Sequence, residues 1–200
     1  MIGVIDHGAG NLASVGYALD HLGLRWRAVR HPRQLATVDA IIFPGVGAAG
    51  AAMSRLRQTG LERAVLAFLK SGRPYLGICL GLQLLFQASA EDDSPCLSVL
   101  EGRVVRPPTA AKLPHVGWNT VELLRPCSLL EGFDGAAFYF THSYVVDPAS
   151  PELACARTSH GAPFVSAIEQ GQLFGVQFHP ERSGEAGLQV LARFARQMAA

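Results

Sequence analysis

The first half of the chain alternates between short apolar runs and stretches in which apolar residues recur at helical spacing. The runs are rich in branched and aromatic side chains and predict strands at Ile2–Ile5, Trp26–Val29, Asp39–Phe43 and Pro74–Ile78. The helical spacing predicts helices over residues 11–22, 50–70 and 80–88, the second in two pieces around Gly60. Strands and helices that alternate in this way are typical of a parallel sheet with helices on both faces.

The second half changes character, because short apolar runs follow one another with only turns between them. They predict a final helix over residues 184–198 and strands at Arg103–Arg106, Trp118–Leu123, Ala137–Phe140, Tyr144–Val146, Leu153–Arg157, Phe164–Glu169 and Leu173–Phe178. Strands this closely spaced favour antiparallel hairpins attached to the parallel sheet. The polar stretch Ala90–Pro95 is the best candidate for a linker, but we expect one domain over residues 1–200.

Composition narrows the class of protein. Seventeen Lys and Arg against sixteen Asp and Glu give a net charge of +1, which argues against nucleic-acid binding. Charged residues make up 16% of the chain, well below a typical soluble domain, so we expect a partner to cover part of the apolar surface. The uncharged run Ala40–Ser54 is broken by Pro44 and by glycines, and it is too short to span a membrane.

The four cysteines, Cys79, Cys96, Cys127 and Cys155, lie far apart, with no pair at zinc-binding spacing. No secretory signal precedes them. We therefore expect free thiols in a reducing compartment, a cytoplasmic location and no metal site.

The segment Gly77-Ile78-Cys79-Leu80-Gly81 joins the fourth predicted strand to an apolar helix. A nucleophile elbow needs this arrangement, because its central residue sits in a cramped turn whose flanking positions must lack bulk. The turn would expose the Cys79 sulfur at the carboxyl end of the sheet and at the start of a helix, whose dipole favours the thiolate. A buried structural cysteine between two packing glycines explains the pentapeptide equally well.

The segment Gln177-Phe178-His179-Pro180-Glu181 contains a candidate base and a candidate orienting carboxylate. Pro180 disfavours helical backbone at His179, so we expect an extended segment in which His179 and Glu181 project to the same side. The carboxylate could then accept a hydrogen bond from one imidazole nitrogen and leave the other facing a nucleophile. A strand-end turn with a solvated Glu181 is the safer interpretation of an isolated His-x-Glu. Two ligands without a third do not predict a metal site.

The glycines of Pro44-Gly45-Val46-Gly47, directly after a strand, would let the backbone approach a ligand closely. One of these amides, with the Leu80 N–H, could form an oxyanion hole. A plain turn is the common alternative, and a phosphate-binding loop is a poor one because no Lys-Ser or Lys-Thr follows. Together the three segments supply a nucleophile, a base, an orienting group and oxyanion donors in one α/β chain.

The run Gly77–Gln83, with the late His179–Glu181, resembles the class I, triad-type glutamine amidotransferases. Within that family the chain is similar to the glutaminase subunits of imidazole glycerol phosphate synthase, of histidine biosynthesis. The similarity lies in five segments: Asp6–Asn11, Pro44–Gly47, Lys112–Asn119, Tyr139–Tyr144 and His179–Gly184. It implies a flavodoxin-like fold, with a central, mostly parallel sheet flanked by helices and an added antiparallel strand region.

The resemblance also implies a role for each matching residue. Cys79 would attack the side-chain amide of glutamine, His179 would shuttle the proton, and Glu181 would orient His179. The Val46–Gly47 peptide and the Leu80 N–H would hold the oxyanion of a thioester-forming intermediate. The amino-acid end of the substrate would be held by Gln83, His142, Ser143 and Tyr144. No cofactor is implied.

By the same resemblance, ammonia passes through a covered path to a separate (β/α)₈-barrel cyclase, which makes imidazole glycerol phosphate and AICAR. The residues that match the family's cyclase interface are Asn11, Pro114, Trp118 and Arg182. From the residues alone, Trp118 is nearly as well explained as a core aromatic on a strand, and Arg182 as a surface charge.

The sequence departs from the family pattern at His7, usually Tyr, and at Ala49, commonly Phe. Asp92–Leu97 lacks the usual glycine-rich turn. These departures bear on loops and interface rather than on the triad. One rival interpretation is the glutaminase subunit of pyridoxal phosphate synthase, whose oxyanion segment ordinarily reads Gly-Gly-Glu-Ser. Two others are a free-standing cysteine hydrolase and a non-catalytic regulatory subunit with a vestigial site.

Overall fold

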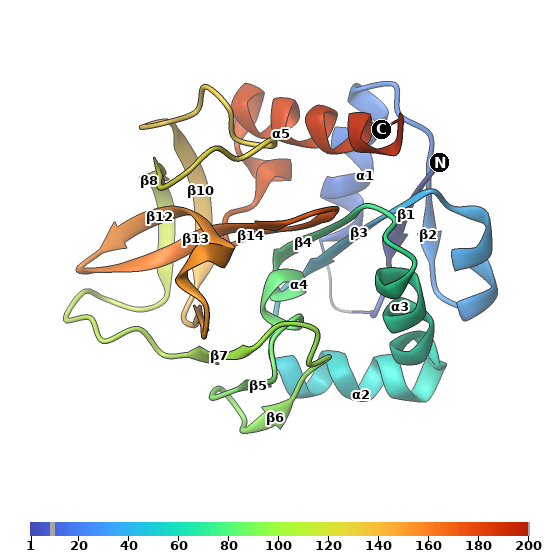
Figure 1. Cartoon of the computed structure of the whole chain (residues 1–200), viewed down its shortest axis with the longest axis horizontal. Helices are drawn as coiled ribbons and strands as arrows, with labels where there is room; N and C mark the ends of the chain where they lie inside the picture. Colours follow the sequence, from blue (N-terminus) through green and yellow to red (C-terminus); the bar gives the residue numbers. More distant parts are fainter. Residues whose placement is uncertain (9–10, 200) are drawn as a thin grey trace.

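The computed structural model describes residues 1–8 and 11–199. Its centre is an eight-stranded mixed sheet in the order β2-β1-β3-β4-β14-β13-β12-β9 (Figure 1). The parallel strands are β2 (Trp26–Val29), β1 (Ile2–Ile5), β3 (Ala40–Gly45), β4 (Tyr75–Cys79) and β14 (Leu173–Val176). The antiparallel strands are β13 (Ala162–Gln170), β12 (Ala154–His160) and β9 (Glu122–Leu123). The expected α/β class is confirmed.

Helices cover both faces of the parallel half of the sheet. α1 (Leu12–His21) and α5 (Gly184–Arg196) lie on one face, and α2 (Ala49–Thr59) and α3 (Leu61–Lys70) lie on the other (Figure 1). Each face has its own buried apolar cluster, because each helix turns one apolar stripe toward the sheet. Short 3₁₀ turns lie at Pro32–Thr37 (η1), Pro151–Leu153 (η2), Pro180–Arg182 (η3) and Gln197–Ala199 (η4). Among the described residues, no helix combines the length and apolar character that a membrane crossing requires.

Residues 88–148 form two smaller sheets. β8 (His115–Thr120) pairs antiparallel with β10 (Ala137–His142). The other sheet contains β11 (Val145–Pro148), β7 (Gly102–Val105), β5 (Ala88–Ser89) and β6 (Ser94–Pro95). The expected antiparallel hairpins are present, for example β12 with β13. The last predicted strand, β14, pairs antiparallel with β13 but also extends the parallel half by pairing with β4.

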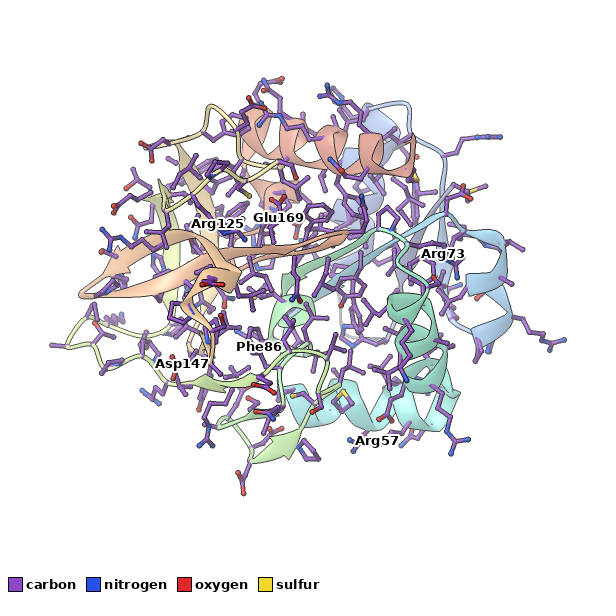
Figure 2. The ribbon with its side chains drawn as sticks, in the orientation of Figure 1. Arg57, Arg73, Phe86, Arg125, Asp147 and Glu169 are labelled. Carbon is purple, nitrogen blue, oxygen red and sulfur yellow. The ribbon has the colours of Figure 1, made fainter. Side chains whose placement is uncertain are left out.

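The predicted helix over residues 80–88 is wrong beyond its first turn, because α4 covers only Leu80–Gln83. The carbonyls of Leu84, Leu85 and Phe86 accept hydrogen bonds from the amides of residues 97–100 instead of continuing a helix. Phe86 lies in the interior of the molecule (Figure 2). The predicted linker is also wrong, since Ala90–Pro95 contains the turn between the paired strands β5 and β6.

The pairing of β4 with β14 positions the site. The two strands are parallel neighbours, in a register that sets Ile78 opposite Val176. Cys79 and the segment after Val176 therefore emerge side by side at the carboxyl edge of the sheet, where open α/β sheets bind their ligands.

Candidate active site

Cys79 occupies a strained turn between β4 and α4. Its φ of 52° is in the left-handed region, which costs a residue with a side chain about 1–3 kcal/mol. The turn is possible because the flanking glycines leave room: a Cβ on Gly77 would lie 2.5 Å from the Gly81 carbonyl oxygen, and one on Gly81 would collide with the Phe43 carbonyl. The Cys79 side chain lines a cavity, so the elbow interpretation describes this segment better than a purely structural cysteine does.

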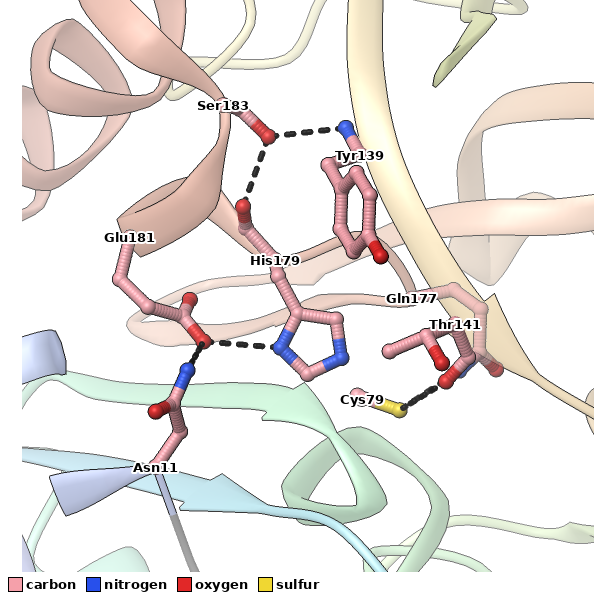
Figure 3. A network of polar contacts seen from close by, with 8 residues as sticks. All are labelled: Asn11, Cys79, Tyr139, Thr141, Gln177, His179, Glu181 and Ser183. Carbon is pink, nitrogen blue, oxygen red and sulfur yellow. Dashed lines mark hydrogen bonds and ion pairs between the residues drawn. The ribbon is translucent and has the colours of Figure 1, made fainter. Parts of the chain in front are cut away.

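His179 and Glu181 form a buried pair next to this turn (Figure 3). His179 Nδ1 lies 2.8 Å from Glu181 Oε1, and the two side chains are 1% and 0% exposed. The alternative of a solvated Glu181 is therefore wrong. The backbone expectation was half right: His179 is extended, but Glu181 belongs to the 3₁₀ turn η3, which folds its carboxylate back onto the imidazole.

Three further hydrogen bonds hold this pair in place. Asn11 Nδ2 donates to the same carboxylate oxygen, Glu181 Oε1, at 3.1 Å. Ser183 Oγ donates to the His179 carbonyl at 2.7 Å and accepts the Tyr139 N–H at 2.9 Å, which ties η3 to β10 (Figure 3). Asn11 thus reaches the site as a second partner of the carboxylate, a contact that its expected interface role did not include.

The free nitrogen of His179 faces the Cys79 sulfur (Figure 3). Nε2 is buried and has no hydrogen-bond partner in the described part of the chain. Burial opposes protonation of His179, but the neighbouring Cys79 sulfur and then Glu181 outweigh it and raise its pKa to about 10. A histidine held by a carboxylate on one side and facing a cysteine sulfur on the other is the arrangement that activates a cysteine nucleophile.

Gln177 is a residue of this site that the sequence reasoning did not single out. Its Nε2 donates to the Cys79 sulfur at 3.4 Å, and its side chain is fully buried. The sulfur in turn lies 3.8 Å from the Thr141 carbonyl oxygen. The signal was available, because residues 177 and 179 are two apart at the end of a strand and must project to the same side.

The helix dipole places less positive potential at the Cys79 sulfur than we expected from the sequence. α4 has only four residues, so few peptide dipoles align behind Cys79. The polar groups beside the sulfur are instead the His179 imidazole and the Gln177 amide.

A cavity of about 230 Å³ opens beside Cys79 and collects most of the expected site residues. Its lining includes the expected oxyanion and substrate residues, Val46, Gly47, Leu80, Gln83, His142, Ser143 and Tyr144. Pro114, expected at a partner interface, also lines it. A larger cavity of about 470 Å³ lies at the amino end of β4 and β14, but none of the triad residues lines it. The chemistry therefore assigns the site to the smaller cavity.

Two of the expected substrate residues have side-chain nitrogens that are engaged within the protein. Gln83 Nε2 donates to the Tyr144 carbonyl at 3.0 Å and to Gln177 Oε1 at 3.2 Å. The ring nitrogens of His142 lie 3.0 Å from the Tyr144 carbonyl oxygen and 3.1 Å from His115 Nδ1. Both side chains shape the cavity wall. The cavity is also lined by Glu91, an acidic residue that the sequence reasoning missed and whose pKa is raised by burial and by Asp92.

Trp118 and Arg182 lie on the surface, around Tyr139. Trp118 is 59% exposed and meets the Tyr139 ring edge-on, with ring centroids 6.3 Å apart. The Arg182 guanidinium lies over the same ring, 4.2 Å from its centroid. The alternative of Trp118 as a core aromatic is wrong.

The departures from the family pattern fall around the site rather than in it. His7 is buried against the Phe43 ring, and burial lowers its pKa. Ala49 is buried at the first position of α2. Two residues of the Asp6–Asn11 segment, Ala9 and Gly10, lie outside the described residues.

Away from the cavity beside Cys79, three side chains among the described residues lie close enough together to hold a metal ion: Cys127, Cys155 and Glu169. All four cysteines are free thiols, and the sulfurs of Cys127 and Cys155 are 3.1 Å apart. The hydrogen bond from Cys155 and burial raise the pKa of Cys127.

Comparison with known proteins identifies relatives along the whole chain. The family model for glutamine amidotransferase class-I matches residues 3–198. The imidazole glycerol phosphate synthase subunit HisH of Desulfitobacterium hafniense (strain DSM 10664 / DCB-2) is 44% identical over 98% of this chain and 94% of its own length. The protein of that name from Moorella thermoacetica is 46% identical over 96% of this chain and 93% of its own. That from Methanothermobacter thermautotrophicus is 43% identical over 97% of both.

Solved structures share the fold at lower identity. One described as a glutamine amidotransferase has a TM-score of 0.79 and 23% identity, and the match covers 100% of this chain and 99% of that one. The structure of PurLQS from Thermotoga maritima has a TM-score of 0.78 and 17% identity, over 98% and 97% of the two chains.

Proposed function

The chain belongs to the class I glutamine amidotransferase family, and from that premise we propose that it is the glutaminase subunit of an imidazole glycerol phosphate synthase. Relatives of that name are 43–46% identical over nearly the full length of the chain. The observation that supports catalysis most directly is the alignment of three side chains, in which Glu181 holds one side of His179 and the Cys79 sulfur faces the other.

In the proposed reaction the Cys79 thiolate attacks the side-chain amide carbon of glutamine, and a carbon–sulfur bond forms. The carbonyl oxygen becomes an oxyanion, which the Leu80 N–H and the Val46–Gly47 peptide would accept. The protonated His179 gives its Nε2 proton to the departing nitrogen, so that ammonia leaves and a thioester remains. His179 then removes a proton from water, which attacks the thioester and releases glutamate.

The substrate would enter the cavity beside Cys79. The wall formed by Gln83 and by residues 142–144 would contact its amino-acid end. The Glu91 carboxylate offers the ammonium group of glutamine a partner of opposite charge.

We propose that the partner is a (β/α)₈-barrel cyclase, to which ammonia passes without entering bulk water. The surface around Trp118, Tyr139 and Arg182 is a suitable docking face, because it presents aromatic and arginine side chains. Asn11 and Pro114 would lie under the edge of the docked partner. We also propose that the chain acts as a single domain, without a cofactor, in the cytoplasm.

The test is glutamate release from glutamine by the chain alone and after addition of the cyclase subunit with its nucleotide ligand. We expect slow hydrolysis alone and faster hydrolysis in the complex, since docking would turn the Val46–Gly47 peptide into place. Cys79→Ala should abolish hydrolysis and leave partner binding intact. Equal rates with and without the cyclase would contradict the subunit role, and hydrolysis by Cys79→Ala would contradict the nucleophile. Activation by the barrel subunit of pyridoxal phosphate synthase instead would support that rival.

A further inference from the structure

A chain of hydrogen bonds connects the surface strand β8 to the Cys79 sulfur, and every bond in it has a defined direction. Its centre is the main-chain carbonyl of Tyr144, which can only accept. Two side chains approach this oxygen: Gln83 Nε2 at 3.0 Å and His142 Nδ1 at 3.0 Å. Both must therefore donate to it.

One arm runs from this carbonyl to the nucleophile. Gln83 points its NH₂ group at the Tyr144 carbonyl, and the same NH₂ group lies 3.2 Å from one end of the Gln177 side-chain amide. Since an NH₂ group donates, the Gln177 atom at that end must be the oxygen. The other end of the Gln177 amide is then the NH₂ group, which lies 3.4 Å from the Cys79 sulfur. The sulfur thus faces a hydrogen-bond donor, the arrangement that favours a thiolate.

The other arm runs from the carbonyl to the surface. His142 donates from Nδ1, so in the neutral ring its Nε2 must accept, and His115 Nδ1 donates to it at 3.1 Å. His115 Nε2 must accept in turn, and Asn119 Nδ2 lies 3.3 Å away. Asn119 also donates to the Ser159 carbonyl at 2.9 Å and accepts the Thr120 N–H.

The packing of this arm restricts movement of its members. His115 is stacked on His160, with ring centroids 4.1 Å apart, and on Phe140 at 5.0 Å. His142 is buried against Phe164 at 5.0 Å. His115 is the first residue of β8, so a displacement of β8 has to move it. Neither the His115 ring nor the His142 ring can rotate without breaking a hydrogen bond of this series.

We propose that Gln177 is a positioning residue whose amide holds the Cys79 sulfur as a thiolate, and that the chain from Asn119 to Gln177 couples the position of β8 to this contact. Trp118 and Asn119 are neighbours on β8, so a partner that shifts the Trp118 surface also moves the end of the chain. The coupling to a partner rests on the function proposed above, whereas the contact with the sulfur does not.

The experiment measures the rate at which iodoacetamide alkylates Cys79 as a function of pH, in the full chain, by mass spectrometry of the peptide that contains Cys79. Only the thiolate reacts, so the midpoint of the profile reports the thiolate population. Gln177→Met keeps the side-chain length and removes the donor. A hydrogen bond to a charged group supports an effect of about tenfold, so we expect the midpoint to rise by about one pH unit. Gln177→Glu should shift it in the same direction.

Asn119→Ala tests the coupling at a partly exposed position that should fold. We expect a smaller upward shift, and a shift in the double variant with Gln177→Met that is less than the sum of the two. Thr120→Ala, exposed on the same strand, is the matched control and should leave the midpoint unchanged. An unchanged midpoint in both Gln177 variants would overturn the role of Gln177. Strict additivity, or no shift in Asn119→Ala, would overturn the coupling. Glutamine hydrolysis by the unmodified chain is measured in parallel, so failure of the proposed function is seen separately.

Discussion

Glu181→Gln is the substitution for which the structure makes the most distinctive prediction. Glu181 Oε1 lies 2.8 Å from His179 Nδ1 and 3.1 Å from Asn11 Nδ2. An NH₂ group at this position would face two donors, so the glutamine should place its oxygen there and its nitrogen at the position of Oε2. The hydrogen bond from His179 Nδ1 is then kept, and with it the tautomer that leaves Nε2 able to accept the thiol proton.

The expected loss is therefore modest. A hydrogen bond to a charged group stabilises by about 1.5–3 kcal/mol and a neutral one by about 0.5–1.5 kcal/mol, so the change removes about 1–2 kcal/mol. This corresponds to a fall of roughly 5- to 30-fold in kcat/KM. Loss of the negative charge should also lower the raised pKa of His179. A reversed amide would favour the wrong tautomer, and in a serine-protease triad that costs about 10⁴-fold.

The assay is glutamate release by the complex with the cyclase, measured for Glu181→Gln, Asn11→Ala and the double variant. KM for glutamine should stay near that of the unmodified chain, because Glu181 does not line the cavity beside Cys79. In the double variant the amide is free to reverse, so its loss should exceed the product of the two single losses. A thousandfold loss of kcat/KM in Glu181→Gln alone would refute the role of Asn11 in fixing the orientation of the new amide. Unchanged turnover would refute the orienting role of Glu181.

Two further predictions concern the fold around the site. Gly81→Ala should prevent stable folding, because its Cβ would collide with the Phe43 carbonyl. Gly171→Ala has nothing near its Cβ, so it should lower the free energy of unfolding by only about 1–2 kcal/mol, the cost of its positive φ. Thermal unfolding compares the two variants, and equal melting temperatures would contradict this prediction. Burial lowers the pKa of His115 to about 4 and of His142 to about 3, below the unfolded value of 6.5. Between pH 6.5 and 4 the unfolded chain then binds more protons than the folded one. The free energy of unfolding should therefore decrease as the pH is lowered, by up to about 1.4 kcal/mol per pH unit for each histidine. Urea unfolding at pH 7.5, 6 and 5 measures this, and His142→Gln should show a shallower slope.

The parts of the fold that could be predicted are those whose pattern is local. The strands β1, β3 and β4 are short apolar runs between turn residues. The predicted break at Gly60 is also present, because Gly60 has a φ of 72° and separates α2 from α3. The length of α4 could not be predicted in this way. The apolar residues that follow α4 suit a buried helix. However, the amides of residues 97–100 donate to the carbonyls of residues 84–86, and this alternative to helical hydrogen bonding is visible only in the tertiary fold.

The same distinction holds in the site. Cys79, His179 and Glu181 stand in short segments whose residue types indicate their chemistry. The spacing of Gln177 to His179 indicates only that the two side chains project to the same side. The roles of Gln177 and Asn11 depend on what lies opposite them: a sulfur for Gln177 and a carboxylate for Asn11. His115 could not be linked to the site at all, because its connection passes through His142 and a main-chain carbonyl.

The pairing of β4 with β14 explains why these contacts occur together. Its register sets Val176 opposite Ile78, so Gln177 reaches the level of Cys79 and His179 projects on the same side. Moving this register by one residue would turn Gln177 and His179 to the other face and take both groups from the sulfur at once. The Gly175 position helps to exclude that slip, because a Cβ there would lie 2.5 Å from Leu82, at the back of α4. The packing of one glycine under α4 therefore constrains both the nucleophile's base and its hydrogen-bond donor.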